Sequence, residues 1–300
     1  MTVDVLIVGA GPAGLTAALV LARAGRDVLV LDGGPGRNAP AAHSHNVFTR
    51  EGASPTELRR IGRTQAESYG ARFLEQEAVR AEADEDGVRV QLADGSEMKT
   101  RRLLLATGVE DLLPEIPGVA EAWGETVVHC PYCHGFELRE RPTAVLDAGE
   151  KGVHLSGLLL GWTDHVTLCC GPDRLSGDER QRLTGLGVDI DERPVAALGV
   201  EGRDVRTVVF EDDSQIDATA VYIQPDQRPR GPLPDALGLE HTELGHVRVD
   251  EFMRTSAPGV SACGDVTSPM QAVQIAASSG FTAAAFLNND LIDQGRTYTG

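Results

Sequence analysis

Two cysteines separated by two residues are the most reactive pair of side chains in this sequence. They lie in the run Cys130–Gly135, which reads Cys-Pro-Tyr-Cys-His-Gly. A Cys-x-x-Cys spacing lets two sulfurs close a small disulfide ring. Pro131 suits the first position of a helix, whose N-terminus would lower the pKa of a thiolate. The run therefore predicts thiol–disulfide exchange.

Zinc binding is the alternative use of such a pair. A tetrahedral site would need a second cysteine pair or two spaced histidines as further ligands. His129 and His134 flank the pair too closely to complete a tetrahedron easily, and Cys169 and Cys170 end an apolar run typical of a buried strand. Cys263 is expected to be a small buried residue. The spacing favours redox chemistry, and we expect no metal.

His134 directly follows the second cysteine and is the candidate acid–base group. A free imidazole has a pKa of about 6.5 and a free thiol one of about 8.5, so a neutral imidazole can take a thiol proton near neutral pH. A single histidine is more often structural than catalytic. The position beside the cysteine pair is what favours the catalytic interpretation.

A glycine-rich turn near the N-terminus predicts a dinucleotide site. The run Gly9–Gly14 (Gly-Ala-Gly-Pro-Ala-Gly) follows the apolar run Val3–Val8 and precedes a helical pattern over Leu15–Ala24, and Asp32 ends a second apolar run at Val28–Leu31. The three glycines allow a tight turn, approach of a diphosphate and close helix–strand packing, and the acid accepts ribose hydroxyls. A turn without nucleotide is disfavoured because strand, helix and acid are all present.

Two further segments extend the pattern. Leu104–Gly108 is an apolar run that ends in Thr-Gly, and Ser261–Asp265 reads Ser-Ala-Cys-Gly-Asp. With these segments the sequence resembles the two-dinucleotide-domain flavoproteins, specifically the low-molecular-weight thioredoxin reductases, over nearly the whole chain. The resemblance implies an α/β fold with two Rossmann-like domains, a homodimer, and FAD as cofactor.

The resemblance also implies domain limits and roles. The FAD domain would be discontinuous, residues 1–114 with 226–300, around a central domain of residues 115–225 that carries the cysteines. A helix N-terminus at the isoalloxazine carbonyl would stabilise the negative charge of reduced flavin. The residues expected to contact FAD are Gly9, Gly11, Pro12, Ala13, Gly14, Asp32, Gly33, Arg37, Asn38, His45, Val79, Thr107, Gly108, Asp265, Gln271 and Ala272.

For the cysteines, the resemblance implies that Cys133 attacks flavin C4a and that Cys130 exchanges with the substrate thiol. The sequence departs from the family at the next position, because His134 stands where an acid/base aspartate is usual.

The central domain should repeat the dinucleotide motif after an apolar run at Thr143–Leu146, but this second motif is degraded. Its turn, Asp147–Gly152, reads Asp-Ala-Gly-Glu-Lys-Gly. A carboxylate about 5 Å from a phosphate charge costs on the order of 3 kcal/mol at an effective dielectric of 20. After the next apolar run, only Arg174 stands where NADPH-dependent relatives have a basic cluster, and Asp173 is the sole candidate for an NAD ribose. We therefore expect that NAD(P)H binding is lost.

This combination is similar to the small-molecule dithiol oxidases of natural-product pathways, which close the disulfides of gliotoxin, holomycin and romidepsin. The segment Arg37–Asn46, with His43 and His45, is also similar to the flavin-side loop of that group. The resemblance implies an enzyme of antibiotic biosynthesis that oxidises a small dithiol and reduces O2 to H2O2. The identity of the dithiol is not readable from the sequence.

Three alternatives stay open. A thioredoxin reductase fed by NAD(P)H is disfavoured by Asp147, and one fed by reduced ferredoxin would have much the same sequence. A flavin-bound redox sensor or binding protein without turnover is disfavoured by the intact cysteine pair.

The composition excludes some partners. The chain has 300 residues and a net charge of −18, which disfavours nucleic acid and anionic membranes because both are polyanions. No apolar run reaches the roughly 18 residues that cross a bilayer, and the glycine-broken N-terminus does not read as a signal sequence. Five cysteines without framework spacing fit a cytoplasmic protein.

Several further elements must position these residues. We expect a helix over Pro55–Tyr69, strands near Val79–Ala81 and Val88–Leu92, and a boundary at Leu113–Gly118. The remaining expectations are a helix over Val153–Gly161, a strand at His165–Cys170, a crossover at Pro225–Pro234, a strand at Gly259–Ala262 and a helix from about Gln271 to Ile292.

Overall fold

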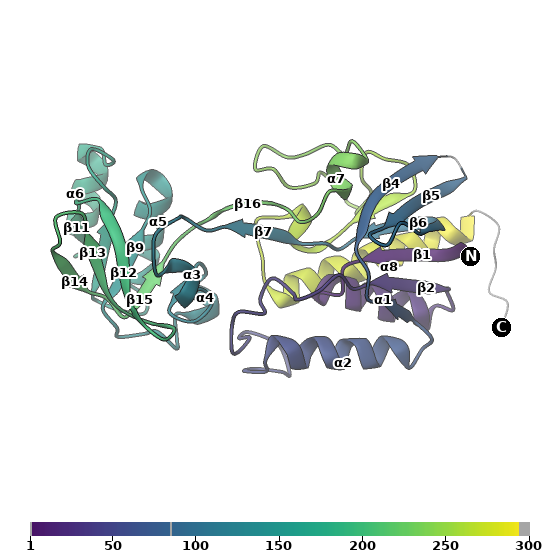
Figure 1. The fold of residues 1–300 in the computed structure, drawn as a ribbon, viewed down its shortest axis with the longest axis horizontal. Coiled ribbons are helices and arrows are strands. Elements are labelled where there is room, and N and C mark those ends of the chain that lie inside the picture. Colours follow the sequence, from purple (N-terminus) through teal and green to yellow (C-terminus); the bar gives the residue numbers. More distant parts are fainter. Residues whose placement is uncertain (1, 85, 294–300) are drawn as a thin grey trace. The chain divides into compact units, whose positions relative to one another are not determined.

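The computed structural model describes residues 2–84 and 86–293 and divides into two compact units (Figure 1). The first unit contains residues 1–39, 47–110 and 227–300, and the second contains residues 40–46 and 111–226. The chain passes between them through β7 (Val109–Leu112) and β16 (Asp226–Pro229), which pair with each other. Within the described ranges, no helix combines the length and apolarity needed to span a membrane.

The first unit is built on a mixed sheet in the order β3-β2-β1-β6-β5-β4, whose strands run parallel from β3 to β6, whereas β5 and β4 pair antiparallel. At its centre β1 (Thr2–Val8) lies between β2 (Val28–Leu31) and β6 (Glu97–Leu105), with Val8 opposite Leu31 on one side and Leu105 on the other. Outside these, β3 (Arg72–Leu74) pairs with β2, and β17 (Val260–Ala262) pairs with the end of β6. This order is that of a Rossmann-type sheet, in which ligands bind beyond the carboxyl ends of the strands.

The two faces of this sheet are covered differently. Val5 and Ile7 pack in a core with α1 (Pro12–Arg23) and α8 (Val273–Asp293), whereas Leu6 and Val8 pack in a second core on the opposite face. The alternation follows from the two-residue repeat of a strand. The second core includes residues of β4 (Ala78–Asp84), β5 (Gly87–Leu92) and α7 (Leu233–Ala236), while α2 (Pro55–Glu67) packs against α1.

The second unit contains another parallel sheet in the order β11-β10-β9-β15-β8. Its strands are β8 (Val127–Val128), β9 (Thr143–Leu146), β10 (Val166–Cys169), β11 (Asp189–Asp191) and β15 (Ala220–Tyr222). Helices α5 (Gly149–Leu159) and α6 (Gly177–Gly185) pack against it, and α3 (Val119–Ala122) and α4 (Pro131–His134) are single turns. The antiparallel sheet of β12 (Val195–Glu201), β13 (Asp204–Phe210) and β14 (Gln215–Asp217) completes the unit.

The predicted fold class, two Rossmann-like α/β units with the first assembled from separate stretches of chain, is confirmed. The β12–β14 sheet was not predicted from the sequence, and α5 begins at Gly149 rather than at the expected Val153. Residues 40–46 group by contacts with the second unit, although the sequence suggested that they belong with the FAD domain.

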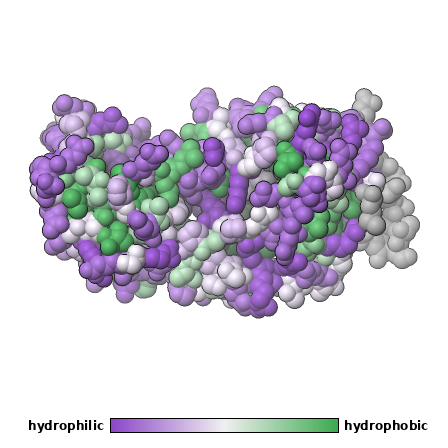
Figure 2. Space-filling model, in the orientation of Figure 1, coloured by the Kyte–Doolittle hydropathy of each residue, from purple (hydrophilic) through white to green (hydrophobic). Residues whose placement is uncertain are grey.

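Hydrophilic side chains cover most of the face shown in Figure 2, in keeping with the net charge of −18.

The turn after β1 gives a first prediction. Gly9 has φ +110°, and a Cβ there would lie 2.3 Å from the carbonyl oxygen of Ala106. Gly9→Ala should lower the melting temperature by well over 5 °C, because left-handed strain of about 1–2 kcal/mol adds to a backbone clash. Gly202→Ala, with φ +65° and open space, is the control for strain alone. Equal losses in the two variants, measured by circular dichroism, would contradict the close-approach explanation.

Candidate active site: a dinucleotide turn and a disulfide turn

The Gly9–Gly14 turn has the shape of a phosphate cradle. A Cβ on Gly14 would lie 1.9 Å from the Gly9 carbonyl oxygen, so only glycine lets α1 start this close to β1. Gly11, which caps α1, has no atom within 4 Å of a Cβ position apart from its chain neighbours. Open space thus stands in front of the helix N-terminus, where a diphosphate group binds. Pro12 and Ala13 form the first turn of α1, and Ala13 also packs against Gly280 of α8.

Thr107 and Gly108 follow β6 at the same sheet edge. The Thr107 hydroxyl oxygen is buried and has no hydrogen-bond partner among the described residues. Gly108 adopts φ +71°, and its carbonyl oxygen accepts a hydrogen bond from the Arg230 backbone N–H at 3.0 Å. A buried hydroxyl without a partner costs about 1–3 kcal/mol, so it fits a bound polar ligand such as the ribityl or phosphate part of FAD.

The structure brings three of the residues expected at FAD together in the first unit. Arg37 Nη1 donates to Asp265 Oδ2 at 3.1 Å and to Gln271 Oε1 at 2.5 Å. The Gln271 amide in turn donates to Gln227 Oε1 at 2.8 Å. Asp265 lies in η1 (Gly264–Thr267), and the Ala272 carbonyl accepts from Ala276, which makes it part of the first turn of α8.

His246 is a neighbour of this cluster that the sequence did not reveal. It is 5% exposed, and neither ring nitrogen has a hydrogen-bond partner in the described chain. Burial lowers the pKa of His246, while the nearby Asp265 raises it. No motif surrounds this histidine, so only the folded structure identifies it.

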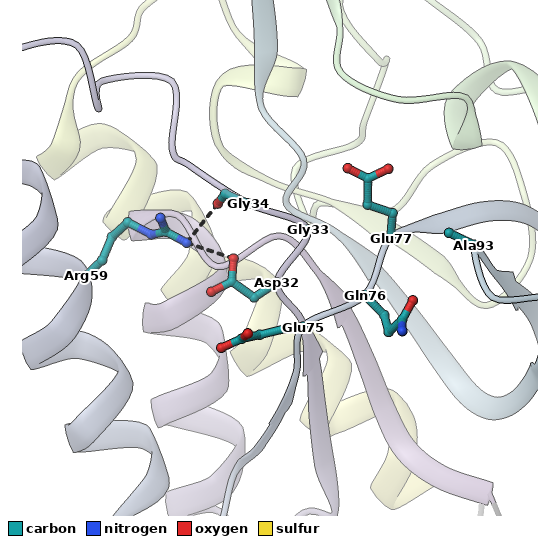
Figure 3. A pocket seen from close by; sticks show the side chains of 8 residues that line it. All are labelled: Asp32, Gly33, Gly34, Arg59, Glu75, Gln76, Glu77 and Ala93. Carbon is teal, nitrogen blue, oxygen red and sulfur yellow. Dashed lines mark hydrogen bonds and ion pairs between the residues drawn. The ribbon is translucent and has the colours of Figure 1, made fainter.

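Asp32 lies in a cavity of about 530 Å³ at the ends of β2 and β3 (Figure 3). Arg59 of α2 donates from Nη2 to Asp32 Oδ1 at 2.7 Å and to the Gly34 carbonyl at 3.0 Å. Its Nε donates to the Ala10 carbonyl at 3.3 Å. Arg59 therefore joins the acid to the glycine turn and was missed because no motif marks it. The cavity lining is Asp32, Gly33, Gly34, Arg59, Glu75, Gln76, Glu77 and Ala93.

Of the residues expected at FAD, the cavity lining contains Asp32 and Gly33, whereas Val79 and Asn38 are among those outside it. Val79, 39% exposed on β4, is absent from it, and residues 75–77 occupy the position between β3 and β4 instead. Asn38 lies in the loop after β2, where its Oδ1 would be 3.3 Å from a Cβ on Gly36.

The cysteine run forms a tight turn in the second unit. Cys130 and Cys133 are joined by a disulfide, with Cα atoms 5.3 Å apart. The backbone N–H groups of Cys133 and His134 both donate to the Cys130 carbonyl. A Cβ on Gly135 would lie 2.9 Å from the Trp162 ring, so the turn sits directly against this side chain. The helix has a single turn, and its dipole is therefore smaller than the sequence suggested.

His134 is set back from solvent beside the disulfide. Its Nδ1 is buried and has no hydrogen-bond partner in the described chain. Burial lowers its pKa most, the nearby His45 lowers it further, and Glu137 raises it. His45, which the sequence suggested for the flavin site, lies in the second unit with Nε2 3.6 Å from Glu137 Oε1. The net effect keeps His134 neutral, the form in which an imidazole accepts a proton.

The second glycine-containing turn follows β9 and differs from the first. Gly152 still packs closely, since a Cβ there would lie 3.1 Å from the Asp147 carbonyl carbon. Asp147 Oδ1, however, accepts the Ala148 backbone N–H at 2.7 Å, and Oδ2 is buried without a partner. Burial raises the pKa of Asp147, and Lys151 lowers it. The carboxyl group thus takes an N–H at the start of the helix that a phosphate would otherwise use.

Basic residues near the next strands are already paired with acids. Arg180 Nη2 donates to Glu192 at 2.7 Å, and Arg193 forms an ion pair with Asp191 at the end of β11. Arg174 is exposed in the loop after β10. Cys169 ends β10 in the core, where burial raises the pKa of its thiol to about 12, so it is a structural residue.

The sequence matches the family described as pyridine nucleotide-disulphide oxidoreductase over residues 3–280. Thioredoxin reductase tcpT of Claviceps purpurea (strain 20.1) is 34% identical, covering 97% of this chain and 94% of its own length. Thioredoxin reductase sirT of Leptosphaeria maculans is 35% identical, with 95% and 93% covered. The crystal structure of HlmI is 40% identical with a TM-score of 0.93, covering 98% and 93% of the two chains.

Arg59 gives a prediction for cofactor binding. Arg59→Met should weaken FAD binding about tenfold, because it removes a charge-assisted hydrogen bond that orients Asp32. The measurement is titration of apoprotein by flavin fluorescence quenching. Arg60→Met on the same helix removes an exposed pair with Glu57 and is the matched control. Unchanged affinity in Arg59→Met would refute this role.

The surroundings of His134 give a prediction for pH dependence. Burial lowers the pKa of His134 below the ordinary 6.5. The rate at which a dithiol reduces the protein should therefore begin to decline only when the pH drops below 6.5. His134→Gln should lower the rate at least a hundredfold and remove this limb, as expected for loss of a general base worth about 10²–10⁴. The check is a pH profile by stopped flow, and an acid limb above 6.5 would show that another group is titrating.

Proposed function

The chain belongs to the pyridine nucleotide-disulphide oxidoreductase family, and on that basis we propose that it is a dithiol oxidase. In this proposal the Cys130–Cys133 disulfide oxidises a small-molecule dithiol of a natural-product pathway to an intramolecular disulfide. FAD is the cofactor, and dioxygen is the final electron acceptor, reduced to H2O2. The Gly9–Gly14 turn, Thr107 and the Asp32 cavity are the groups that would hold FAD.

The observation that carries this proposal is the Asp147 turn. Its carboxyl group caps the first backbone N–H of the turn at 2.7 Å, so a nicotinamide cofactor would have to displace it before its phosphates could bind. Asp147 also lacks the positive φ that Gly9 uses in the first turn. In this proposal, the Cys130–Cys133 disulfide therefore receives its electrons from the thiols of the substrate.

The protein side chains would act in two exchange steps. A substrate thiolate attacks Cys130 Sγ, which breaks the Cys130–Cys133 bond and releases Cys133 as thiolate. The second substrate thiolate attacks the first substrate sulfur, which closes the substrate disulfide and releases Cys130. Two electrons and two protons leave the substrate, and His134 accepts a thiol proton. Bound FAD would supply the two-electron acceptor for the enzyme dithiol and the route from it to dioxygen.

The neighbourhood of the disulfide supports a small substrate that has apolar parts. Tyr132 and Phe136 are 65% and 64% exposed on either side of His134 in sequence. Exposed aromatic rings beside reactive sulfurs offer apolar contact area to a ligand. A homodimer is part of the proposal through the family resemblance.

A second candidate is a thioredoxin reductase driven by NAD(P)H, which the names of the fungal relatives favour. A reductase fed by ferredoxin is a variant of this candidate. In both, the cysteine pair would reduce a disulfide rather than make one.

The deciding experiment is anaerobic mixing of the holoenzyme with either dithiothreitol or NADPH. We expect dithiothreitol to bleach the flavin within seconds and NADPH to leave it oxidised, and admitted air should then yield one H2O2 per flavin. Cys133→Ser should lower dithiol-driven reduction at least a thousandfold, whereas Cys169→Ser, at a buried structural thiol, should not. Fast bleaching of the flavin by NADPH would refute the proposal and support the second candidate.

A further inference from the structure

The segment Pro40–Asn46 brings two histidines to the unit that carries the disulfide. Asn46 Nδ2 donates to the Tyr132 carbonyl at 2.6 Å, inside the redox turn itself. At the other end of the segment, Arg203 Nη2 donates to the Pro40 carbonyl at 2.8 Å. The segment is thus fixed to this unit at both ends, although the residues before and after it belong to the other unit.

The middle of the segment places an imidazole against a carboxylate. His45 Nε2 lies 3.6 Å from Glu137 Oε1, and the two side chains are 18% and 39% exposed. The rings of His43 and His45 have centroids 6.3 Å apart. Glu137 follows His134 by three residues, one helical turn, and both His45 and Glu137 act electrostatically on His134. The imidazoles of His45 and His134 and the carboxylate of Glu137 therefore lie in the same surroundings, beside the disulfide.

A second proton acceptor near the disulfide would let the two exchange steps proceed without waiting for His134 to pass on its proton. Each of the two steps begins with a thiolate, because the thiol form is a poor nucleophile. Two protons must therefore leave the substrate sulfurs in one cycle. His134 can hold one of them, and until it is discharged it cannot serve the second step.

We propose that the His45–Glu137 pair is the second proton acceptor and takes the proton of the thiol that closes the substrate disulfide. His134 then takes the proton of the first attacking thiol, because it directly adjoins Cys133 in the redox turn. Glu137, whose Oε1 lies 3.6 Å from His45 Nε2, would favour the protonated imidazole by charge attraction, as a carboxylate does for a catalytic imidazole elsewhere. This inference rests on the proposed function and adds a catalytic residue to it.

Several titratable groups face one another at this site. His134 faces His45 and Glu137, and Tyr222 lies near Glu137. Burial raises the pKa of Tyr222, so its phenol stays neutral.

The test separates the two steps with the holoenzyme, dithiothreitol and acid quenching. Mass spectrometry then follows the mixed disulfide between dithiothreitol and Cys130. In His45→Gln we expect this species to form within twofold of the native rate and to decay at least tenfold more slowly. Glu137→Gln should slow the same decay by less, and His134→Gln should slow formation instead. His154→Gln, an exposed histidine of the same unit, is the control.

Rescue by added imidazole distinguishes a catalytic role of His45 from a merely structural one. Added imidazole should restore the decay step in His45→Ala severalfold, with no effect on the control, and flavin content should match that of the native protein. Native-rate decay in His45→Gln, equal slowing of both steps, or absence of rescue would overturn the inference. If instead the native enzyme forms no mixed disulfide with dithiothreitol, the proposed function itself fails.

Discussion

A backbone N–H at the start of a helix serves one acceptor at a time, and this constraint distinguishes the two halves of the molecule. At the first turn, Gly9 and Gly11 contribute no side chain, and the N-terminus of α1 faces open space. At the second turn, Asp147 accepts the N–H of Ala148 with its own carboxyl group. The two turns thus offer a phosphate opposite environments. The first is open at Gly11, whereas the second is capped by the Asp147 carboxyl group.

The direction of electron flow that we propose follows from this difference. If a nicotinamide cofactor cannot bind at the second turn, a substrate thiol can take over as the electron donor to the disulfide, which is the direction that we propose. The buried Nδ1 of His134 and its lowered pKa suit a base that stays neutral while thiols are deprotonated. The same burial disfavours a charge that stays on His134, which favours a second proton acceptor, the role that we propose for the His45–Glu137 pair.

The cofactor side depends on links that join distant parts of the sequence. Arg59 connects α2 to the end of β2, and Arg37 connects the loop after β2 to Asp265 and Gln271, more than 200 residues later. Such arginines are common at sites for phosphate and carboxylate groups because their donors are arranged in a fixed fork. Arg59 has no signature in the sequence, whereas the resemblance placed Arg37 at the FAD site. In both cases only folding brings the partner side chains near.

The sequence by itself determined the glycine turn with Asp32 and the disulfide-forming pair, because each depends on residues that are close in the chain and obey local geometry. Through the resemblance that these motifs carry, it also indicated the fold class. Tertiary structure alone decided what surrounds them. It placed His45 beside Glu137 and left Val79 outside the Asp32 cavity. It also placed the Asp147 carboxyl group where it accepts the backbone N–H of Ala148, the N-cap of α5. The physical reason is that spacing fixes backbone turns, whereas side-chain partners across a fold are fixed only when packing joins segments far apart in sequence.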